Sequence, residues 1–481
     1  MPIFETTLTW GTLYVASEWI IRLAMLFYVP QRRSAAAARA WLLLIFFLPW
    51  AGLVLYGAFG RAHLPRQRAE MELTVSRLIR ELQPRILGST LTSAPDLPPA
   101  FEQAVGLART LGDFGICRGN RIELITEYHE GIERLVEDIA KAQSHVHLMY
   151  YIFRYDQTGR RVAAALAAAA ARGVQCRVMA DGYGSWFSFW RLGPALRKAG
   201  VEALLLMPPR VWGRKAVRLD LRNHRKIAVI DGHIGYVGSQ NIVDPDANPR
   251  LTNEELVARV TGPVVRQLQA VLLADRFYET ETMAGDRVED LMPELAEPGS
   301  SLAQVMPSGP GYHRGNLQQI MIALIHAARY RVVLTTPYFV PDEPFLLALC
   351  MAARRGVEVR LVLSRHSNKP IVHLAQQSNY EDLLDAGAHI HLYHGNFLHA
   401  KHATIDDCVA LVGSSNFDIR SFALNNEVAL LIYDREVVTR LRAVQRRYLE
   451  ESDTLDLQAW RRRGVPARVA QNIARLADTL L

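Results

Sequence analysis

The sequence is poor in cysteine, with only Cys117, Cys176, Cys350 and Cys408 in 481 residues. Their spacing matches neither a disulfide framework nor a metal site of the CxxC type, which excludes a small disulfide-stapled fold and a cysteine-built zinc domain. No charge sign dominates either, because 55 Lys and Arg against 48 Asp and Glu leave a net charge of +7. That balance suits an anionic partner but does not choose between nucleic acid and anionic lipid.

One polar pattern, HxKxxxxDxxxxxxGSxN, occurs twice with identical spacing. The first copy consists of His224, Lys226, Asp231, Gly238, Ser239 and Asn241, and the second of His399, Lys401, Asp406, Gly413, Ser414 and Asn416. Because His and Lys are two residues apart, both project from the same face of an extended strand. The apolar run that follows ends at Asp231 or Asp406, where a tight turn into a second strand is expected. Each aspartate is therefore predicted to fix the turn rather than to lie beside the histidine.

The residue types of each motif suit a phosphoryl group. Gly238 and Gly413 would let backbone N–H groups approach a phosphate, and Ser239 and Ser414 could donate to it. Displacement at phosphorus needs a nucleophile on one side and a proton donor on the other, so two motifs facing each other can form one site. Internal symmetry alone does not say which histidine takes which role. A duplicated surface hairpin is the alternative, but it gives no reason for His and Lys at the same offsets.

The pair of motifs resembles the phospholipase D superfamily, whose active site takes one motif from each half of the molecule. The resemblance implies a double displacement in which neutral His224 forms a phosphohistidine and protonated His399 donates to the leaving alcohol. The motif lysines, with Asn241 and Asn416, would stabilise the non-bridging oxygens in place of a metal ion. No metal and no cofactor is therefore expected.

Each histidine is expected to have an orienting carboxylate, because the two rings must hold opposite protonation states. Counting along the chain after each motif gives Glu255 and Glu427 as equivalent acids. Superfamily members carry such an acid bonded to the histidine of the same or the opposite half, and both arrangements are open here. Solvated acids at strand starts are the alternative.

A metal site is the competing hypothesis for the second half, where histidines gather at a spacing that could bind zinc. They are His389, His391, His394, His399 and His402. The first half has only His224 and His233 in the comparable stretch, and a symmetric site should not need metal in one half. The extra histidines are therefore interpreted as strand and loop residues beside the pocket.

The duplication extends beyond the motifs. Tyr151-Ile152-Phe153, an alanine-rich helical run and residues 172–178 parallel Tyr338-Phe339-Val340, a second helical run and residues 355–361. Each half is predicted as strand, helix, strand, helix, strand and motif hairpin. The fold class is therefore α/β, with two pseudo-twofold-related phospholipase D-type domains whose mixed sheets are flanked by helices.

The predicted domains are residues 101–285 and 312–455. Stretches rich in Pro, Gly, Ser and acids indicate linkers at residues 63–100 and 286–311. Residues 456–481 form a basic segment with apolar residues at helical spacing. It is predicted to lie on a bilayer surface, with packing onto the domain as the alternative.

Residues 1–62 have a different composition and are predicted as a transmembrane hairpin. Apolar spans at residues 8–29 and 40–59 are each about as long as a hydrocarbon core requires, with an alanine-rich bend between them. Glu18 and Arg22 lie four apart and can pair within the first span. A cleaved signal peptide is the alternative, but no Lys or Arg precedes the apolar stretch and a second span follows. The distribution of arginines favours a cytoplasmic catalytic region.

With the hairpin, the segment TPYFVPDE at 336–343 and the closing NIARL at 472–476, the chain resembles bacterial cardiolipin synthases over essentially its whole length. That family transfers the phosphatidyl group of one phosphatidylglycerol to the terminal hydroxyl of another, which gives cardiolipin and glycerol. The resemblance implies these two lipids as partners, no nucleic acid, and a multi-pass location in the bacterial cytoplasmic (inner) membrane.

One departure and one alternative follow from this resemblance. Related synthases often have a Trp-Arg-Asp type of sequence after the first motif, where this chain has Thr252-Asn253-Glu254-Glu255, so the choice of carboxylate is open. A membrane-anchored phospholipase D or nuclease that hydrolyses phosphodiesters is the alternative function, because nothing in the motifs excludes water as acceptor.

Overall fold

The computed structural model describes residues 9–33, 35–60, 66–92, 95–208, 220–246, 251–282, 291–312 and 315–476. The chain divides into two compact units. The first contains residues 1–69 and 209–221, and the second contains residues 70–208 and 222–481. Both motif copies therefore belong to the second unit.

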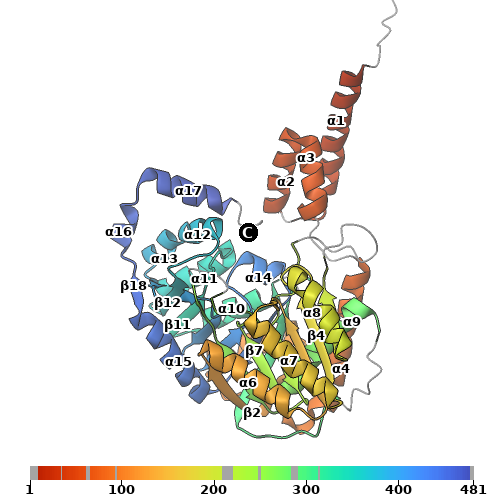
Figure 1. The fold of residues 1–481 in the computed structure, drawn as a ribbon. Helices are drawn as coiled ribbons and strands as arrows, with labels where there is room; N and C mark the ends of the chain where they lie inside the picture. Colours follow the sequence, from red (N-terminus) through yellow and green to blue (C-terminus); the bar gives the residue numbers. More distant parts are fainter. Residues whose placement is uncertain are drawn as a thin grey trace, which may run out of the picture. The chain divides into compact units, whose positions relative to one another are not determined.

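The first unit is helical (Figure 1). Its elements are α1 (Trp10–Tyr28), α2 (Ala35–Phe47), α3 (Pro49–Leu55) and a π-helical turn, η1 (Tyr56–Gly60). α1 lies within the first predicted span, and Glu18 and Arg22 form the predicted ion pair at 3.2 Å. In the described part of the chain, no helix combines the length and the apolar character that a membrane crossing requires.

The second predicted span, residues 40–59, is not one helix. The alanines expected in a bend instead begin α2, because alanine is the strongest helix former. α2 ends at Phe47 and a new helix begins at Pro49, whose missing N–H is tolerated only in a first turn.

A sixteen-stranded sheet, continuous through both halves, forms the centre of the second unit. Its order is β18-β13-β12-β11-β15-β16-β17-β10-β2-β9-β7-β6-β3-β4-β5, with β1 paired to β2. The first-half strands are β1 (Leu91–Thr92), β2 (Ile116–Ile125), β3 (His145–Tyr150), β4 (Gln175–Asp181), β5 (Glu202–Leu206), β6 (Ile227–Ile230), β7 (Ile234–Gly238), β8 (Asn253–Glu254) and β9 (Val257–Thr261). The second-half strands are β10 (Ser301–Ser308), β11 (Arg331–Thr336), β12 (Glu358–Ser364), β13 (His389–Tyr393), β14 (Phe397–Leu398), β15 (His402–Ile405), β16 (Val409–Gly413), β17 (Glu427–Ile432) and β18 (Ser452–Thr454).

The strand order shows the pseudo-twofold relation. From the antiparallel β2–β10 pair outward, each half has three antiparallel strands, with the motif hairpin among them, and then three parallel strands. β6 and β7 form the first motif hairpin, and β15 and β16 form the second. The mixed sheets predicted for the two halves are thus parts of one sheet.

Helices cover both faces of this sheet (Figure 1). α9 and α15 pack on one face, while α6 to α8 and α5, α10 and α11 pack on the other. The helices of the second unit are α4 (Arg66–Leu87), the 3₁₀ turn η2 (Gly88–Thr90), α5 (Pro99–Leu111), α6 (Tyr128–Lys141), α7 (Gln157–Ala171), α8 (Trp186–Lys198), α9 (Val264–Thr280), α10 (Asn316–Ala327), α11 (Glu343–Arg354), α12 (Pro370–Gln377), α13 (Tyr380–Asp385), α14 (Ile419–Ala423), α15 (Arg435–Glu450), α16 (Leu457–Arg461) and α17 (Val465–Arg475). α4 begins in the first unit.

Both predicted linkers contain regular structure, which corrects that part of the prediction. α4 occupies most of residues 63–100. β10 lies within residues 286–311 and pairs with β17 and β2 at the centre of the sheet. Its polar Gln304 does not mark a loop, because the buried amide donates to the carbonyl oxygen of Phe114 at 2.7 Å.

Candidate active site

The two motif histidines lie just before β6 and β15, in backbone that pairs with the opposite half. The N–H of His224 donates to the carbonyl oxygen of Asn426, and the N–H of His399 donates to that of Glu254, both at 2.8 Å. β14, which leads into His399, pairs in parallel with β8. Main-chain hydrogen bonds from both directions therefore hold the halves together at the motifs.

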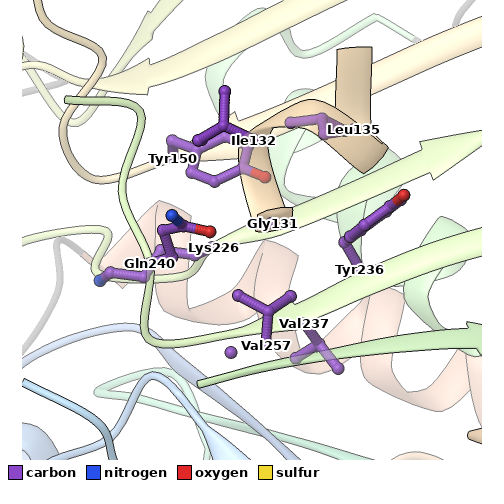
Figure 2. A pocket seen from close by; sticks show the side chains of 10 residues that line it. Gly131, Ile132, Leu135, Tyr150, Lys226, Tyr236, Val237, Gln240 and Val257 are labelled. Atoms are coloured by element: carbon purple, nitrogen blue, oxygen red, sulfur yellow. The ribbon is translucent and has the colours of Figure 1, made fainter. Parts of the chain in front are cut away.

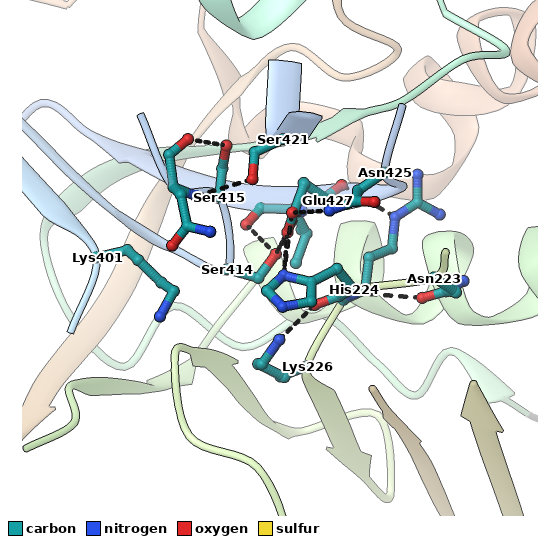
Figure 3. Close-up of polar contacts among 12 residues, drawn as sticks. Asn223, His224, Lys226, Lys401, Ser414, Ser415, Ser421, Asn425 and Glu427 are labelled. Carbon is teal, nitrogen blue, oxygen red and sulfur yellow. Dashed lines mark hydrogen bonds and ion pairs between the residues drawn. The ribbon is translucent and has the colours of Figure 1, made fainter. Parts of the chain in front are cut away.

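Each histidine contacts a glutamate of the other half. Nδ1 of His224 lies 3.0 Å from a carboxylate oxygen of Glu427, as Figure 3 shows. Nδ1 of His399 lies 2.7 Å from Oε1 of Glu255. Glu427 is 0% exposed and Glu255 is 2% exposed. With a carboxylate accepting at Nδ1, Nε2 of each ring is the nitrogen left for chemistry.

The crossed arrangement answers the two points that the sequence left open. The orienting acid belongs to the opposite half in both cases. Glu255, rather than its neighbour Glu254, contacts the histidine, because successive side chains on a strand point in opposite directions. Glu254 instead accepts a hydrogen bond of 2.8 Å from the amide of Asn396.

The motif lysines lie next to their own histidines. Nζ of Lys226 donates to the carbonyl oxygen of His224 at 2.6 Å, and Nζ of Lys401 donates to that of His399. Burial lowers the pKa of Lys226 to about 8 and that of Lys401 to about 7, against the opposing effect of the two glutamates. An anion entering the site would favour the charged form of both lysines.

A small cavity lies on the first-half side of Lys226 (Figure 2). It is lined mainly by apolar groups of α6 and of β3, β7 and β9, among them Ile132, Leu135 and Val257. This surrounding is consistent with burial as the main cause of the lowered pKa of Lys226.

The two histidine–glutamate pairs are not electrically equivalent. Burial holds the pKa of His224 well below its ordinary value, and the charges of Lys226, Lys401 and His399 lower it further. Burial also lowers the pKa of His399, to about 4, but Glu255 opposes this effect. The asymmetry favours protonation of His399 over protonation of His224.

The glutamates show a matching asymmetry. Burial raises the pKa of Glu427 to about 7, although Lys226 and hydrogen bonds oppose it. Burial also acts to raise the pKa of Glu255, but His399 and Lys401 outweigh it, so that pKa lies below its ordinary value. Near neutral pH the carboxylate beside His399 is thus the more fully charged of the two.

Asp231 and Asp406 lie in the turns, at the place that their spacing predicts. Their φ angles are 51° and 47°, in the left-handed region that aspartate tolerates better than most residues. Each carboxylate accepts three backbone N–H groups at 2.7–2.9 Å. The donors are Gln143, Ser144 and His145 in the first half and Arg329, Tyr330 and Arg331 in the second.

The motif glycines and serines have other partners than the predicted phosphate. A Cβ on Gly238 would lie 2.3 Å from the carbonyl oxygen of Leu256, and one on Gly413 would lie 2.4 Å from that of Val428. Both glycines therefore make room for the neighbouring strand. The hydroxyl of Ser414 donates to Oε2 of Glu427 at 2.5 Å.

Ser239 and Asn241 also have partners within the protein. The hydroxyl of Ser239 donates to the carbonyl oxygen of Leu256 and accepts from its N–H at 2.9 Å. Oδ1 of Asn241 accepts the N–H of Ile152 at 3.1 Å. Asn416 differs, because its buried Oδ1 has no hydrogen-bond partner among the described residues. These groups surround the motif lysines and histidines, whose charges act on one another across the two halves.

Two tyrosines belong to the site although no role was predicted for them. The ring of Tyr151 lies 4.7 Å from that of His224, between centroids, and Nζ of Lys226 lies 5.4 Å from the Tyr151 ring. Tyr338 contacts Phe397, whose ring lies 5.8 Å from His399. The duplicated sequence could have indicated both tyrosines, since each follows the first parallel strand of its half.

The additional second-half histidines have separate surroundings. His402 is buried beside Gln445, with its ring stacked on Tyr448. Nδ1 of His391 lies 3.0 Å from the hydroxyl of Thr454. Within the described ranges, no three His, Cys, Asp or Glu side chains are grouped as metal ligands.

Comparisons with known proteins agree with this geometry. The family model described as "Cardiolipin synthase, PLD-like domain" matches residues 135–275 and 321–448. A second, "Phospholipase_D-nuclease N-terminal", matches residues 19–61. The solved structure of phosphatidylserine synthase from Haemophilus influenzae Rd KW20 covers 79% of this chain and 100% of its own, with a TM-score of 0.60 and 13% identity. That likeness shows the fold.

Full-length relatives give a closer match. Cardiolipin synthase A of Yersinia pseudotuberculosis serotype O:1b (strain IP 31758) is 34% identical over 497 residues, covering 100% of both chains. Cardiolipin synthase A of Yersinia pestis bv. Antiqua (strain Angola) has the same identity and coverage. The chain therefore belongs to the cardiolipin synthase family of proteins with phospholipase D-like domains.

Proposed function

We propose that the protein is a cardiolipin synthase, which transfers the phosphatidyl group of one phosphatidylglycerol to the terminal hydroxyl of another and releases glycerol. The observation that carries this proposal is the crossed pairing of His224 with Glu427 and of His399 with Glu255. It makes one site from both halves, with two imidazoles of different proton affinity. The full-length relatives named cardiolipin synthase A support the choice of lipid.

In the first step, Nε2 of neutral His224 attacks the phosphorus of the donor lipid. The phosphorus–nitrogen bond forms while the bond from phosphorus to the glycerol oxygen breaks, and His399 gives its proton to that oxygen. Glu427 accepts a hydrogen bond from Nδ1–H of His224 and stabilises the positive charge that develops on the ring. Lys226 and Lys401 balance the charge on the non-bridging oxygens.

In the second step, the hydroxyl of the acceptor lipid attacks the phosphohistidine. His399, now neutral, takes the hydroxyl proton, and the phosphorus–nitrogen bond breaks to release His224. One phosphodiester is broken and one is formed, so the exchange needs no nucleotide. Water in place of the lipid alcohol would give phosphatidic acid, the product of the hydrolase alternative.

The proposal includes attachment to the bacterial cytoplasmic membrane through the N-terminal helices, as a multi-pass protein with a cytoplasmic catalytic region. Large apolar side chains of α1 and α2 are exposed, with Trp10 at 89%, Phe27 at 71% and Phe47 at 80%. In the catalytic unit, Phe187 and Trp190 of α8 are also exposed, at 87% and 78%. Exposed apolar groups of this size suit a lipid interface.

The test combines purified full-length protein with phosphatidylglycerol vesicles, with and without EDTA, and analyses the products by mass spectrometry. We expect cardiolipin and glycerol in equal amounts from the wild type, and neither from His224→Ala or His399→Ala. Phosphatidic acid without cardiolipin would replace the transferase by a hydrolase. Turnover by either histidine variant at the wild-type rate would overturn the shared site.

A further inference from the structure

The acceptor lipid brings a second negative charge into the site. Its own phosphate is separated from the reacting hydroxyl only by the glycerol headgroup, so both phosphates lie close together during transfer. The motif charges do not provide for it, because Lys226 and Lys401 already face the donor phosphate and the carboxylate of Glu255 adds negative charge beside them. A buried or half-buried anion without a partner is costly, so a further cation is needed.

Lys369 is a cation at the right place. Arginine supplies most of the basic residues, and the lysines of the chain are Lys141, Lys198, Lys215, Lys226, Lys369 and Lys401. Lys369 directly precedes α12, in the loop that follows the parallel strand β12. Its side chain is exposed, and Nζ lies 4.6 Å from the ring centroid of Tyr338. Partial burial of the ammonium lowers the pKa of Lys369, while the charges of Asp418 and Arg420 act on that pKa in opposite directions.

Two aromatic side chains, Tyr338 and Phe397, lie between Lys369 and the reacting His399. The Phe397 ring lies 5.8 Å from His399, and the Tyr338 ring lies 6.2 Å from Phe397. Tyr338 and Phe397 belong to a buried apolar cluster with Val372 of α12. The Tyr338 hydroxyl also donates to Asn368, which fixes the loop over the ring. The ammonium therefore lies over a ring that is packed in an apolar cluster and hydrogen-bonded to the residue before Lys369.

The position of Lys369 fits the acceptor rather than the donor. His399 protonates the alcohol that leaves and deprotonates the alcohol that enters. The rings of Phe397 and Tyr338 lead from His399 to Lys369. The positive charge of Lys369 also contributes to the lowered pKa of His224 and of Lys401, so Lys369 interacts electrostatically with the motif residues. The corresponding loop of the first half, after β4, has Tyr183 under the guanidinium of Arg222, at 4.9 Å.

We propose that Lys369, held over Tyr338, binds the phosphate of the acceptor lipid and thereby selects an anionic lipid alcohol over a neutral one. The inference rests on the proposed function, because it assigns the second substrate of the same site. The leaving glycerol has no phosphate, so Lys369 is not needed for formation of the phosphohistidine. Its contribution falls on the choice of acceptor.

A competition between two alcohols tests this assignment. Full-length protein is given phosphatidylglycerol vesicles in the presence of ethanol, and cardiolipin and phosphatidylethanol are measured together by mass spectrometry. In Lys369→Gln the ratio of cardiolipin to phosphatidylethanol should fall about tenfold, the loss expected from one charge-assisted contact. Lys369→Arg should recover much of the ratio. The matched control is Lys141→Gln, an exposed lysine at the end of α6, which should keep the wild-type ratio.

Each outcome decides the assignment. A wild-type ratio in Lys369→Gln, or an equal fall in Lys141→Gln, would overturn it. A parallel fall of both products at constant ratio would also overturn it, because Lys369 would then serve the chemistry common to both alcohols. Failure of the wild type to make either product would contradict the proposed transferase itself, which separates the two failures.

Discussion

Replacing Glu255 by glutamine removes the charge that favours a protonated His399. The two groups are 2.7 Å apart at their nearest atoms, and both are buried. Unit charges with centres about 4 Å apart interact by about 4 kcal/mol at an effective dielectric constant of about 20. That corresponds to about three pKa units. Because Glu255 opposes the burial that lowers the pKa of His399, Glu255→Gln would lower that pKa further and reduce the fraction of imidazolium about a thousandfold relative to the wild type.

The expected result is a fall in phosphatidyl transfer of about 10² to 10⁴-fold, the usual contribution of a general acid. The assay is cardiolipin formation from phosphatidylglycerol vesicles at neutral pH. A lipid with a p-nitrophenol leaving group should restore most of the first step, because that group departs without a proton. Glu254→Gln is the matched control, since Glu254 faces Asn396 instead of the histidine. Wild-type transfer in Glu255→Gln, or equal damage in Glu254→Gln, would refute the reasoning.

Further predictions concern the lysines and the motif hairpins. The value of kcat/KM for phosphatidylglycerol should fall as the pH rises above about 7, because Lys401 and then Lys226, with pKa values of about 7 and about 8, lose their positive charge. In Lys401→Arg the fall in kcat/KM should begin at a higher pH. A fall at the wild-type pH would contradict this prediction. Asp406→Ala leaves three backbone N–H groups without an acceptor and should lower the free energy of unfolding by about 2–4 kcal/mol in urea titrations, whereas an unchanged midpoint would contradict the role in the turn. Gly413→Ala should lower the melting temperature because its Cβ would meet the carbonyl oxygen of Val428, while Gly106→Ala in α5, with open space around it, should not.

Much of the catalytic arrangement was predictable from the duplicated motif. The spacing of His and Lys, the turn position of Asp231 and Asp406, and the parallel strands of each half depend on local periodicity, which a sequence displays directly. The same holds for the ion pair of Glu18 with Arg22, which depends on one turn of helix.

The pairing of each histidine with the opposite half was not predictable in this way. It depends on the docking of β14 on β8 and of Asn223 on Asn426, contacts between residues far apart in the sequence. The motif serines were predicted to donate to phosphate because nothing local shows that Ser414 lies against Glu427. In the structure these short side chains contact Glu427 and Leu256.

The two linkers were wrong for different reasons. β10 contains Gln304, Pro307 and Ser308, which weaken the alternation expected of a strand, although the strand is central and buried. α4 has a strongly charged sequence with Pro84 near its end, so its composition predicted a linker despite its helical spacing. In both cases tertiary packing overrides the local signal.

The central claim is that His224 is the nucleophile and His399 the acid within one site. The most direct measurement uses a short-chain phosphatidyl-p-nitrophenol, which needs no acid to depart, with each histidine variant. His399→Ala should release one equivalent of nitrophenol in a burst and carry the added phosphatidyl mass on the peptide containing residue 224, while His224→Ala should show neither. A burst from His224→Ala with the added mass at residue 399 would contradict the account.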